Sequence, residues 1–301
     1  MQACLLSLRE PALCAPLTAN RDLGDCLIAN VPLRDLLATK LKRAGFQVVL
    51  PGESSPRTLR IPMDHWVEVE ALVTLGRADQ PACLHDAEGT LLAWKGEAAP
   101  EDCTEKLVTH ATSFRLRYPW DLLRLNEAEL ELLDESSILG EVSPLAQISG
   151  RLRLGAGSRV LSGVVIEGNV VIGANTQVGP NAYVRGATSI GNNCFVGNGA
   201  EVKNSIIYHN SYVSRGCYVG DSLIGSHVTL GAGTVTENHR HDGRSHVSMI
   251  QGQPVNTGRL KFGTVIGDGV KTGVNTSIEA GVKIGIGRTT RPGSYVGSDV
   301  M

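Results

Sequence analysis

This 301-residue sequence has few aromatic residues, little excess of one charge and few long apolar runs. Phe, Trp and Tyr make up 4% of it, so its core has to be built mainly from aliphatic side chains. Its 28 basic and 30 acidic side chains nearly cancel, which argues against a nucleic-acid or membrane-surface footprint. The apolar opening ends at Arg9 and is too short for a signal peptide or a membrane span. We therefore expect a soluble protein whose partners are small molecules or further subunits.

Cysteine is present, but in no arrangement that suggests a function. The seven cysteines are odd in number and widely spread, and no two have the Cys-x-x-Cys spacing. Neither a disulfide framework nor a zinc site is predicted, and a reducing cytoplasm fits this usage best. The seven positions are Cys4, Cys14, Cys26, Cys83, Cys103, Cys194 and Cys217.

An aliphatic residue recurs at every sixth position along the middle of the chain. Glycine follows many of these residues, at points where the backbone has to turn a corner. A fixed short period of this kind is the signature of a repeat architecture. The ladder comprises Val142, Ile148, Leu154, Val160, Ile166, Ile172, Val178, Val184, Ile190, Val196 and Val202.

A six-residue period matches a short strand plus a corner, and three such sides close one triangular coil of eighteen residues. The aliphatic side chain of each step then points into the prism and stacks on its equivalents in the neighbouring coils. The C-terminal half, from about Val142 onward, is therefore predicted to be a left-handed parallel β-helix of hexapeptide repeats.

The ladder is interrupted by two small slips and by one long polar segment. Its register shortens by one residue before Ile207 and slips again before Ile224, which predicts irregular corners. A second ladder with six-residue spacing runs from Ile266 to Val296. Between the two ladders, residues 236–263 should leave the prism as a loop that carries function. The alternative is a mobile surface insertion.

The first 136 residues lack the period and have a mixed α/β pattern. Leucines at helical spacing predict a helix from Pro32-Leu33 to Arg43, followed by a strand at Phe46–Leu50. A later helix, Trp120–Leu133, has a leucine-rich face that we expect to dock on the first coil. The predicted fold class is thus mixed, with an α/β domain over 1–136 and the β-helix over 137–301.

Four blocks along the β-helix carry a resemblance to a known family. They are Glu201–Ser205, Tyr218–Ser222, Gly231–Thr234 and Thr257–Lys261, the last leading to Ile266-Gly267-Asp268. In this order they resemble the sugar-1-phosphate nucleotidyltransferases that carry a C-terminal left-handed β-helix. They resemble in particular the bifunctional glucosamine-1-phosphate acetyltransferase/N-acetylglucosamine-1-phosphate uridylyltransferases and their archaeal-type relatives. The resemblance implies an acetyl-CoA-dependent transferase that forms a homotrimer, with its site between the β-helix wall and a neighbouring subunit.

The N-terminal domain resembles the same family less closely. Val31-Pro32-Leu33 before the first helix and Tyr118–Leu123 look like family landmarks. The chain after Leu5 has no Gly-x-Gly turn that would let backbone N–H groups approach a triphosphate. We interpret residues 1–136 as a shortened, degenerate nucleotidyltransferase-like domain, which would need Mg²⁺ only if it were still active.

The resemblance assigns substrate-binding roles to five residues. Arg185 and Lys203 match the family's phosphate-binding arginine and lysine, and their eighteen-residue spacing puts them on one face of adjacent coils. The alternative is that these two cations are solvated surface side chains. Tyr218, Asn238 and Lys261 match residues that contact the sugar.

The catalytic base is the part of the family pattern that this sequence lacks. Glu201 matches the carboxylate that orients the base, but the family's histidine aligns with Arg215, whose guanidinium stays protonated and cannot accept a proton. His239 is the candidate replacement because imidazole is the right chemical species, and a surface role is the alternative. His239 and His241 have no third ligand at a convincing spacing, so no metal site is predicted. Cys217, near Arg215, either has a lowered thiol pKa or packs inside the coil.

Three functions stay open on these grounds. The first is CoA-dependent acyl transfer to an amino-sugar phosphate or a related sugar phosphate. The second is non-catalytic binding of a sugar phosphate or nucleotide sugar, which Arg215 favours because it adds a cation and removes the base. The third is an active sugar-1-phosphate nucleotidyltransferase, which the missing glycine-rich turn argues against.

Overall fold

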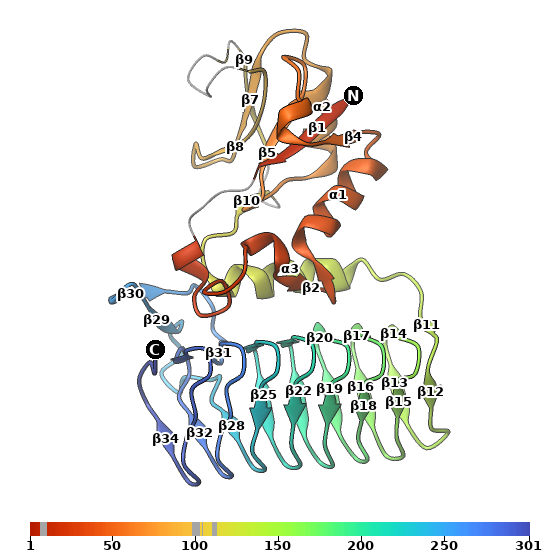
Figure 1. Ribbon diagram of the computed structural model, residues 1–301, viewed down its shortest axis with the longest axis vertical. Helices are drawn as coiled ribbons and strands as arrows, with labels where there is room; N and C mark the ends of the chain where they lie inside the picture. The colour runs from red at the N-terminus through yellow and green to blue at the C-terminus, as the bar shows by residue number, and fades with distance from the viewer. Residues whose placement is uncertain (7–10, 98–102, 104, 110–112) are drawn as a thin grey trace. The chain divides into compact units, whose positions relative to one another are not determined.

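The structure is a computed structural model that describes residues 1–6, 11–97, 103, 105–109 and 113–301 (Figure 1). Its contacts divide the chain into two compact units. The first contains the N-terminal strand, Asp22–Cys26 and Val31–Arg117. The second contains Tyr118–Met301 together with Pro11–Arg21 and Leu27–Asn30. In the described parts of the chain, no helix is long and apolar enough to cross a membrane.

The first unit is a small α/β region built on a six-stranded sheet in the order β4-β1-β5-β8-β7-β9. The predicted helix and the strand after it are confirmed as α1 and β4. The sheet strands are β1 (Gln2–Leu6), β4 (Gln47–Val49), β5 (Leu59–Pro62), β7 (Ala82–His85), β8 (Leu91–Lys95) and β9 (Glu105–Val108). The other elements are α1 (Leu33–Arg43), α2 (Val69–Arg77), β3 (Val31–Pro32), β6 (His65–Trp66), β10 (Phe114–Arg115) and the 3₁₀ turns Leu23–Asp25 and Pro51–Glu53.

One disulfide corrects the prediction made from the cysteines. Cys83 of β7 is bonded to Cys103, 20 residues further along the chain. The two meet because β9 pairs in parallel with β7, and Cys103 lies just before β9. Count and spacing could not reveal this pairing, since it depends on a strand crossover. The other five cysteines are in no disulfide and are buried.

The second unit contains the predicted left-handed parallel β-helix, with about nine turns. Its three sides are parallel sheets, and each strand pairs with its equivalents one coil away. Sheet 1 consists of β11 (Ser137–Ile138), β14 (Leu152–Leu154), β17 (Val170–Ile172), β20 (Thr188–Ile190), β23 (Ile206–Ile207), β26 (Leu223–Ile224), β31 (Val265–Ile266) and β33 (Lys283–Ile284). Sheet 2 consists of β12 (Glu141–Val142), β15 (Arg159–Val160), β18 (Gln177–Val178), β21 (Phe195–Val196), β24 (Tyr212–Val213) and β27 (Thr229–Leu230). Sheet 3 consists of β13 (Gln147–Ser149), β16 (Val165–Glu167), β19 (Tyr183–Arg185), β22 (Glu201–Lys203), β25 (Tyr218–Gly220), β28 (Val235–Thr236), β32 (Ser277–Ile278) and β34 (Tyr295–Val296).

The aliphatic ladder forms the core of the prism, as its period predicted. The aliphatic residues of both ladders from Leu154 onward are buried and belong to one continuous cluster. Ile148 is 39% exposed, because the first coil has a neighbour on one side only. The predicted slip is also confirmed, since Ile190 pairs with Ile207, seventeen residues later.

Helix α3 (Pro119–Glu131) lies along sheet 1, not on the first coil as predicted (Figure 1). Leu130 packs with Val171 of β17, in the third coil. The fully buried Asn126 accepts hydrogen bonds from the Ala29 N–H and the Ser189 hydroxyl and donates one to the Ala187 carbonyl, all at 2.9 Å. These contacts fix α3 to the third and fourth coils. The leucine spacing predicted a buried face but could not specify which coil would cover it.

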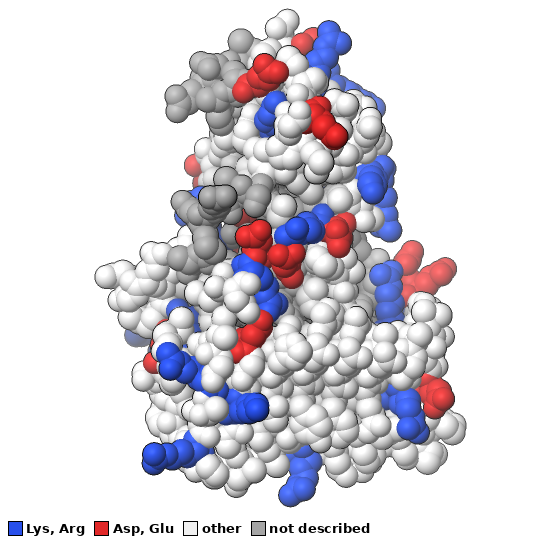
Figure 2. Space-filling model, in the orientation of Figure 1, with Lys and Arg blue, Asp and Glu red and all other residues white. Residues whose placement is uncertain are grey.

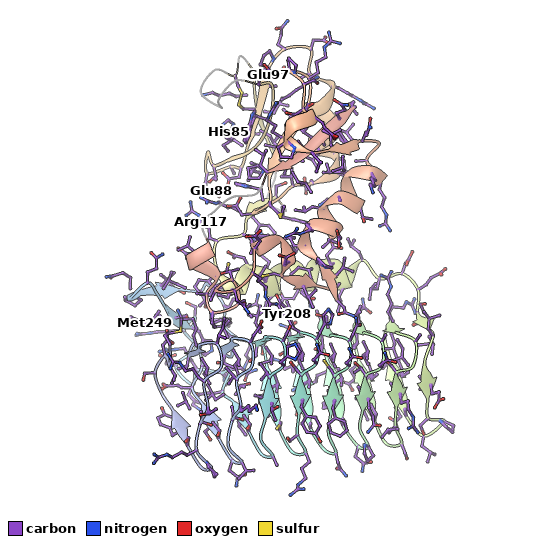
Figure 3. The ribbon with its side chains drawn as sticks, viewed as in Figure 1. His85, Glu88, Glu97, Arg117, Tyr208 and Met249 are labelled. Atoms are coloured by element: carbon purple, nitrogen blue, oxygen red, sulfur yellow. A yellow bond between two sulfur atoms is a disulfide. The ribbon has the colours of Figure 1, made fainter. Side chains whose placement is uncertain are left out.

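Residues 236–263 leave the prism between β28 and β31, as predicted. They contain an antiparallel hairpin of β29 (Val247–Ile250) and β30 (Gln253–Asn256). Ser248 donates a hydrogen bond of 2.7 Å to the Gly281 carbonyl, which ties the hairpin to the later coils. Met249, labelled in Figure 3, is 40% exposed on this hairpin.

Candidate functional site

The outer surface of sheet 3 carries half of the predicted site residues. In β19, β22 and β25 the middle residue is a buried valine, so the flanking side chains point outward. Arg185 pairs in register with Lys203, and Glu201 pairs in register with Tyr218. Four predicted residues from three successive coils therefore share one wall, as the eighteen-residue spacing of Arg185 and Lys203 led us to expect.

Both cations of the predicted phosphate clamp already have carboxylate partners. Arg185 donates from Nε at 2.8 Å and from Nη2 at 2.7 Å to Oε1 of Glu201. This hydrogen bond raises the pKa of the Arg185 guanidinium. Lys203 Nζ lies 2.9 Å from Oδ2 of Asp221. Glu201 thus contacts the arginine of the clamp, whereas the resemblance implied that it would orient a histidine.

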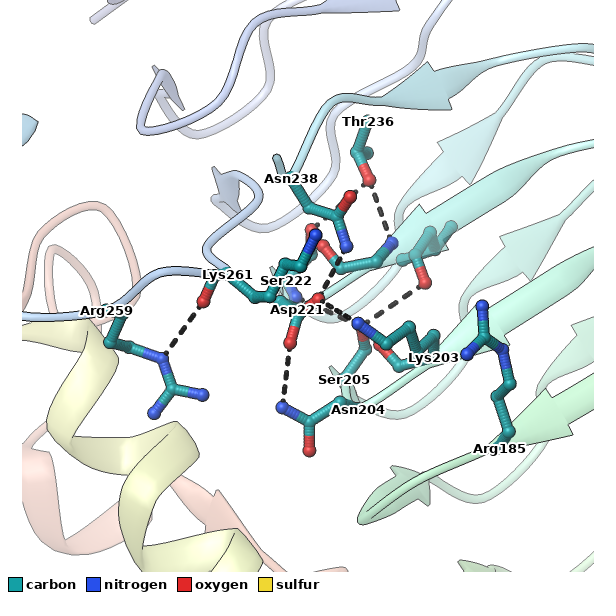
Figure 4. A network of polar contacts seen from close by, with 12 residues as sticks. Arg185, Lys203, Asn204, Ser205, Asp221, Ser222, Thr236, Asn238, Arg259 and Lys261 are labelled. Carbon is teal, nitrogen blue, oxygen red and sulfur yellow. Dashed lines mark hydrogen bonds and ion pairs between the residues drawn. The ribbon is translucent and has the colours of Figure 1, made fainter. Parts of the chain in front are cut away.

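Asp221 is the centre of a polar network that the sequence did not reveal (Figure 4). Besides the Lys203 ammonium, it accepts hydrogen bonds from the side-chain amides of Asn204 at 2.9 Å and Asn238 at 2.5 Å. Its side chain is only 3% exposed. A buried carboxylate with three donors is well satisfied, so the network holds Lys203 and Asn238 in defined positions.

A signal for this network was present at the corners that follow the sheet 3 strands. Gly150, Gly168 and Gly186 occupy this corner in successive coils with positive φ. A Cβ at Gly150 would lie 2.2 Å from the carbonyl oxygen of Gly168, so the early corners require glycine. In the next two coils the corner holds Asn204 (φ 46°) and Asp221 (φ 48°). Asn and Asp tolerate this backbone conformation, and here they place polar side chains beside Lys203.

The loop is joined to α3 through an ion pair. Arg259 donates to the Glu127 carboxylate with both terminal nitrogens, Nη1 at 3.2 Å from Oε2 and Nη2 to Oε1. Oε1 of Glu127 also accepts a hydrogen bond of 2.7 Å from the Asn204 amide. Helix, loop and sheet 3 corner therefore meet at one carboxylate.

The remaining loop candidates lie in different environments. Asn238 is buried, and its carbonyl faces Nε2 of His246 at 3.1 Å. Lys261 is exposed and forms a backbone bridge with His239. The exposed ring of His239 contacts the ring of His241 edge-on, with 5.6 Å between centroids. Within the described residues, no contact joins His239 to Glu201.

Arg215 lies on another corner, between sheets 2 and 3. Its side chain is exposed and lines an open depression of about 680 Å³ together with Asn198, Gly233, Val274 and Asn275. Small side chains and glycines make up most of this lining. An exposed guanidinium in such a depression can meet an anion but cannot serve as a base.

Two further predictions from the sequence can be compared with the structure. Cys217 is buried inside the coil, and its thiol donates to the Gly231 carbonyl at 3.3 Å. Burial raises the pKa of this thiol. Among the described residues, no group of three or more His, Cys, Asp and Glu side chains could hold a metal ion.

Charges of both signs lie close together on the face in Figure 2, and much of that surface is uncharged.

Comparison with known proteins locates the resemblance along the chain. Residues 166–282 match the family described as the GMPPB C-terminal domain. A bifunctional sugar-1-phosphate nucleotidylyltransferase/acetyltransferase of Sulfurisphaera tokodaii is 43% identical over 82 residues, which are 27% of this chain and 20% of that protein. The bifunctional protein GlmU of Methanococcus maripaludis is 40% identical over 82 residues, again 27% and 20%. The match thus spans about one fifth of these relatives.

A solved UDP-N-acetylglucosamine acyltransferase also matches, with 19% identity over 55% of this chain and 68% of that one. Its TM-score of 0.28 is too low to support an argument.

Proposed function

We propose that the β-helix is an acyltransferase that uses acetyl-CoA or a related thioester and modifies an amino-sugar phosphate on the outer surface of sheet 3. The observation that carries this proposal is the alignment of Arg185, Glu201, Lys203 and Tyr218 on one wall. All four lie within residues 166–282, which match the family described as the GMPPB C-terminal domain. The local identity to a bifunctional nucleotidylyltransferase/acetyltransferase supports the same conclusion.

The wall offers the groups that bind a phosphate. Arg185 presents a planar fork and Lys203 adds a point charge, and Lys261 of the loop supplies a further cation. A dianionic phosphate competes with Glu201 for the Arg185 guanidinium, because both are anionic acceptors of the same N–H groups. Binding therefore releases the Glu201 carboxylate beside Tyr218, its register neighbour.

Glu201 is the side chain that we assign as proton acceptor. Its side chain is 30% exposed, whereas that of Asp221 is almost fully buried and already holds three donors. In the transfer step the substrate nitrogen forms a bond to the acyl carbon and the thioester C–S bond breaks. The nitrogen's proton passes to Glu201 and then to the departing thiolate. Arg215 has no part in this proton transfer, because it has no free lone pair.

The second candidate function, non-catalytic binding of a sugar phosphate, is favoured by Arg215. This exposed cation stands where the resemblance implies an imidazole base. On this proposal the wall keeps its affinity for the phosphate and has lost acyl transfer. The two candidates agree about the ligand and differ only in turnover.

Release of the CoA thiol distinguishes them. Acetyl-CoA is incubated with glucosamine-1-phosphate, galactosamine-1-phosphate and related amino-sugar phosphates, using the wild type, Lys203→Ala and Glu201→Gln. Lys271→Ala is the matched control, because Lys271 is an exposed lysine of the β-helix on the side of sheet 2. Acyl transfer at this wall predicts turnover that both site variants abolish and the control keeps. Turnover that survives Lys203→Ala would exclude this wall as the site, and binding without turnover would support the second candidate.

Two proposals about the whole protein accompany this one. We propose a homotrimer, for which sedimentation equilibrium should give three times the chain mass of 32.0 kDa. We also propose that the N-terminal unit has lost nucleotidyl transfer. Pyrophosphate exchange dependent on a nucleoside triphosphate and Mg²⁺ should then be absent, and its detection would restore the third function.

A further inference from the structure

We infer that Glu127 of α3 is a positioning residue for the site on sheet 3. Through Arg259 it fixes the loop that carries Lys261, and through Asn204 it fixes the network that holds Lys203. The consequence for ligand binding rests on the proposed function, while the consequence for the loop does not.

Both oxygens of the Glu127 carboxylate are engaged. The Arg259 guanidinium contacts both of them, and the Asn204 amide donates to Oε1 at 2.7 Å. The Glu127 side chain is 33% exposed and that of Arg259 is 19% exposed. A two-pronged arginine–carboxylate contact fixes direction as well as distance, so it orients the loop more strongly than a single charge would.

The Arg259 side chain, held by Glu127, also contacts the backbone at Lys261. Its Nε donates to the Lys261 carbonyl at 3.3 Å (Figure 4). The Arg259 carbonyl in turn accepts a hydrogen bond of 2.9 Å from the His246 N–H, within the loop. The backbone that presents the Lys261 ammonium therefore depends on the position of the Arg259 guanidinium, which Glu127 sets.

Asn204 links Glu127 to the network around Asp221. Its Nδ2 donates to Glu127 at 2.7 Å and to Asp221 at 2.9 Å, so each of its two N–H groups has a carboxylate acceptor. Asp221 holds Lys203 and Asn238 with its other oxygen. Glu127 thus lies at one end of a continuous chain of hydrogen bonds that ends at two predicted substrate-binding residues.

The fold of α3 does not depend on Glu127. Asn126 anchors the helix to the coils, and Trp120 packs edge-on against the buried Phe262 with ring centroids 5.7 Å apart. Glu127 itself is partly exposed, and ion pairs near the surface contribute little to global stability. Removing its charge should therefore loosen the loop and leave the helix in place.

The test compares Glu127→Gln with Glu131→Gln, the same substitution at an exposed position of the same helix. Amide hydrogen exchange of the ligand-free protein is measured over residues 257–263, and calorimetry gives the affinity for glucosamine-1-phosphate. We expect exchange in this segment to rise by about tenfold in Glu127→Gln only, since local opening limits it. We expect the affinity to fall several-fold while the unfolding midpoint stays near that of the control.

The two readouts fail separately. If the wild type does not bind glucosamine-1-phosphate, the proposed function loses its support, and exchange still tests the positioning role. Unchanged exchange over residues 257–263 in Glu127→Gln would overturn the inference. In the double variant with Arg259→Gln, exchange should rise no further than in Arg259→Gln alone, because Arg259→Gln already removes the contact with Glu127. An additive rise would also count against it.

Discussion

Lys203 Nζ lies 2.9 Å from Oδ2 of Asp221, and the Asp221 side chain is 3% exposed. The lysine that we assign to the substrate phosphate is thus oriented in advance by a buried carboxylate. Removing one partner of such a pair leaves the other charge poorly solvated. The relationship therefore predicts effects on stability as well as on binding.

Asp221→Asn should lower the free energy of unfolding by about 1–3 kcal/mol, because Lys203 and two side-chain amides lose a charged acceptor. Asparagine keeps the shape and tolerates the positive φ of this corner, so the loss reports the charge. The measurement is urea unfolding at pH 7. Asp242→Asn is the control, since Asp242 is paired with Arg240 on the exposed loop. Equal stability of Asp221→Asn and the wild type would contradict this account of the network.

The open end of the β-helix predicts a difference between two isoleucines of one ladder. Ile166 is fully buried, and Ile148, its register neighbour in the first coil, is 39% exposed. Ile166→Ala should cost about 2–5 kcal/mol of unfolding free energy, because it leaves a cavity in a packed column. Ile148→Ala should cost clearly less. Equal losses in thermal or urea unfolding would mean that the first coil is covered.

The buried His246 predicts a loss of stability in mild acid. Burial lowers the pKa of His246 below 6.5 and outweighs the hydrogen bond to the Asn238 carbonyl, which raises it. Arg240 acts in the same direction as burial, against Glu237 and Asp221. The unfolded chain therefore binds a proton at a higher pH than the folded chain does. This contribution is fully present above pH 6.5 and is lost as the pH falls from there towards the lower folded-state pKa.

His246→Gln should reduce that dependence, because glutamine can still donate to the Asn238 carbonyl and does not titrate. His209 should add to this loss of stability in mild acid, because burial also lowers its pKa. The measurement is the unfolding free energy between about pH 5 and 8, the range in which histidines titrate. His241→Gln, at an exposed position, is the control. Identical slopes for His246→Gln and the wild type would contradict the prediction.

The Cys83–Cys103 bond predicts a thiol count. Titration of the unfolded chain should give five thiols without reductant, because five cysteines are in no disulfide, and seven after reduction. Reduction should also destabilise the N-terminal unit by about 3 kcal/mol, since the bond closes a loop of roughly 20 residues. Seven thiols before reduction would show that the bond is absent.

The β-helix could be predicted from the sequence because its contacts repeat. Each ladder residue packs on a residue about eighteen positions away, so one period describes the whole core. The pairing of Arg185 with Lys203 followed from the same period. The position of α3 could not be predicted from this period, because its leucines indicate a buried face but not the coil that covers it.

The network around Asp221 depends on contacts that no period describes. Glu127 and Arg259 are 132 residues apart, and neither position has a spacing rule that links it to the other. The change of residue at the corner after the sheet 3 strands could in principle be seen in the sequence, because Asn204 and Asp221 follow a series of glycines at that position. Recognising it required knowing that this corner follows the strands of sheet 3, which carry Arg185 and Lys203.

If a sugar phosphate binds at Lys203, as we propose, its dissociation constant in titration calorimetry should depend on this lysine. The wild type and Lys271→Ala should bind glucosamine-1-phosphate alike, and Lys203→Ala should bind it at least about tenfold more weakly, a loss of about 1.4 kcal/mol. Equal affinity of Lys203→Ala and the wild type would contradict the claim.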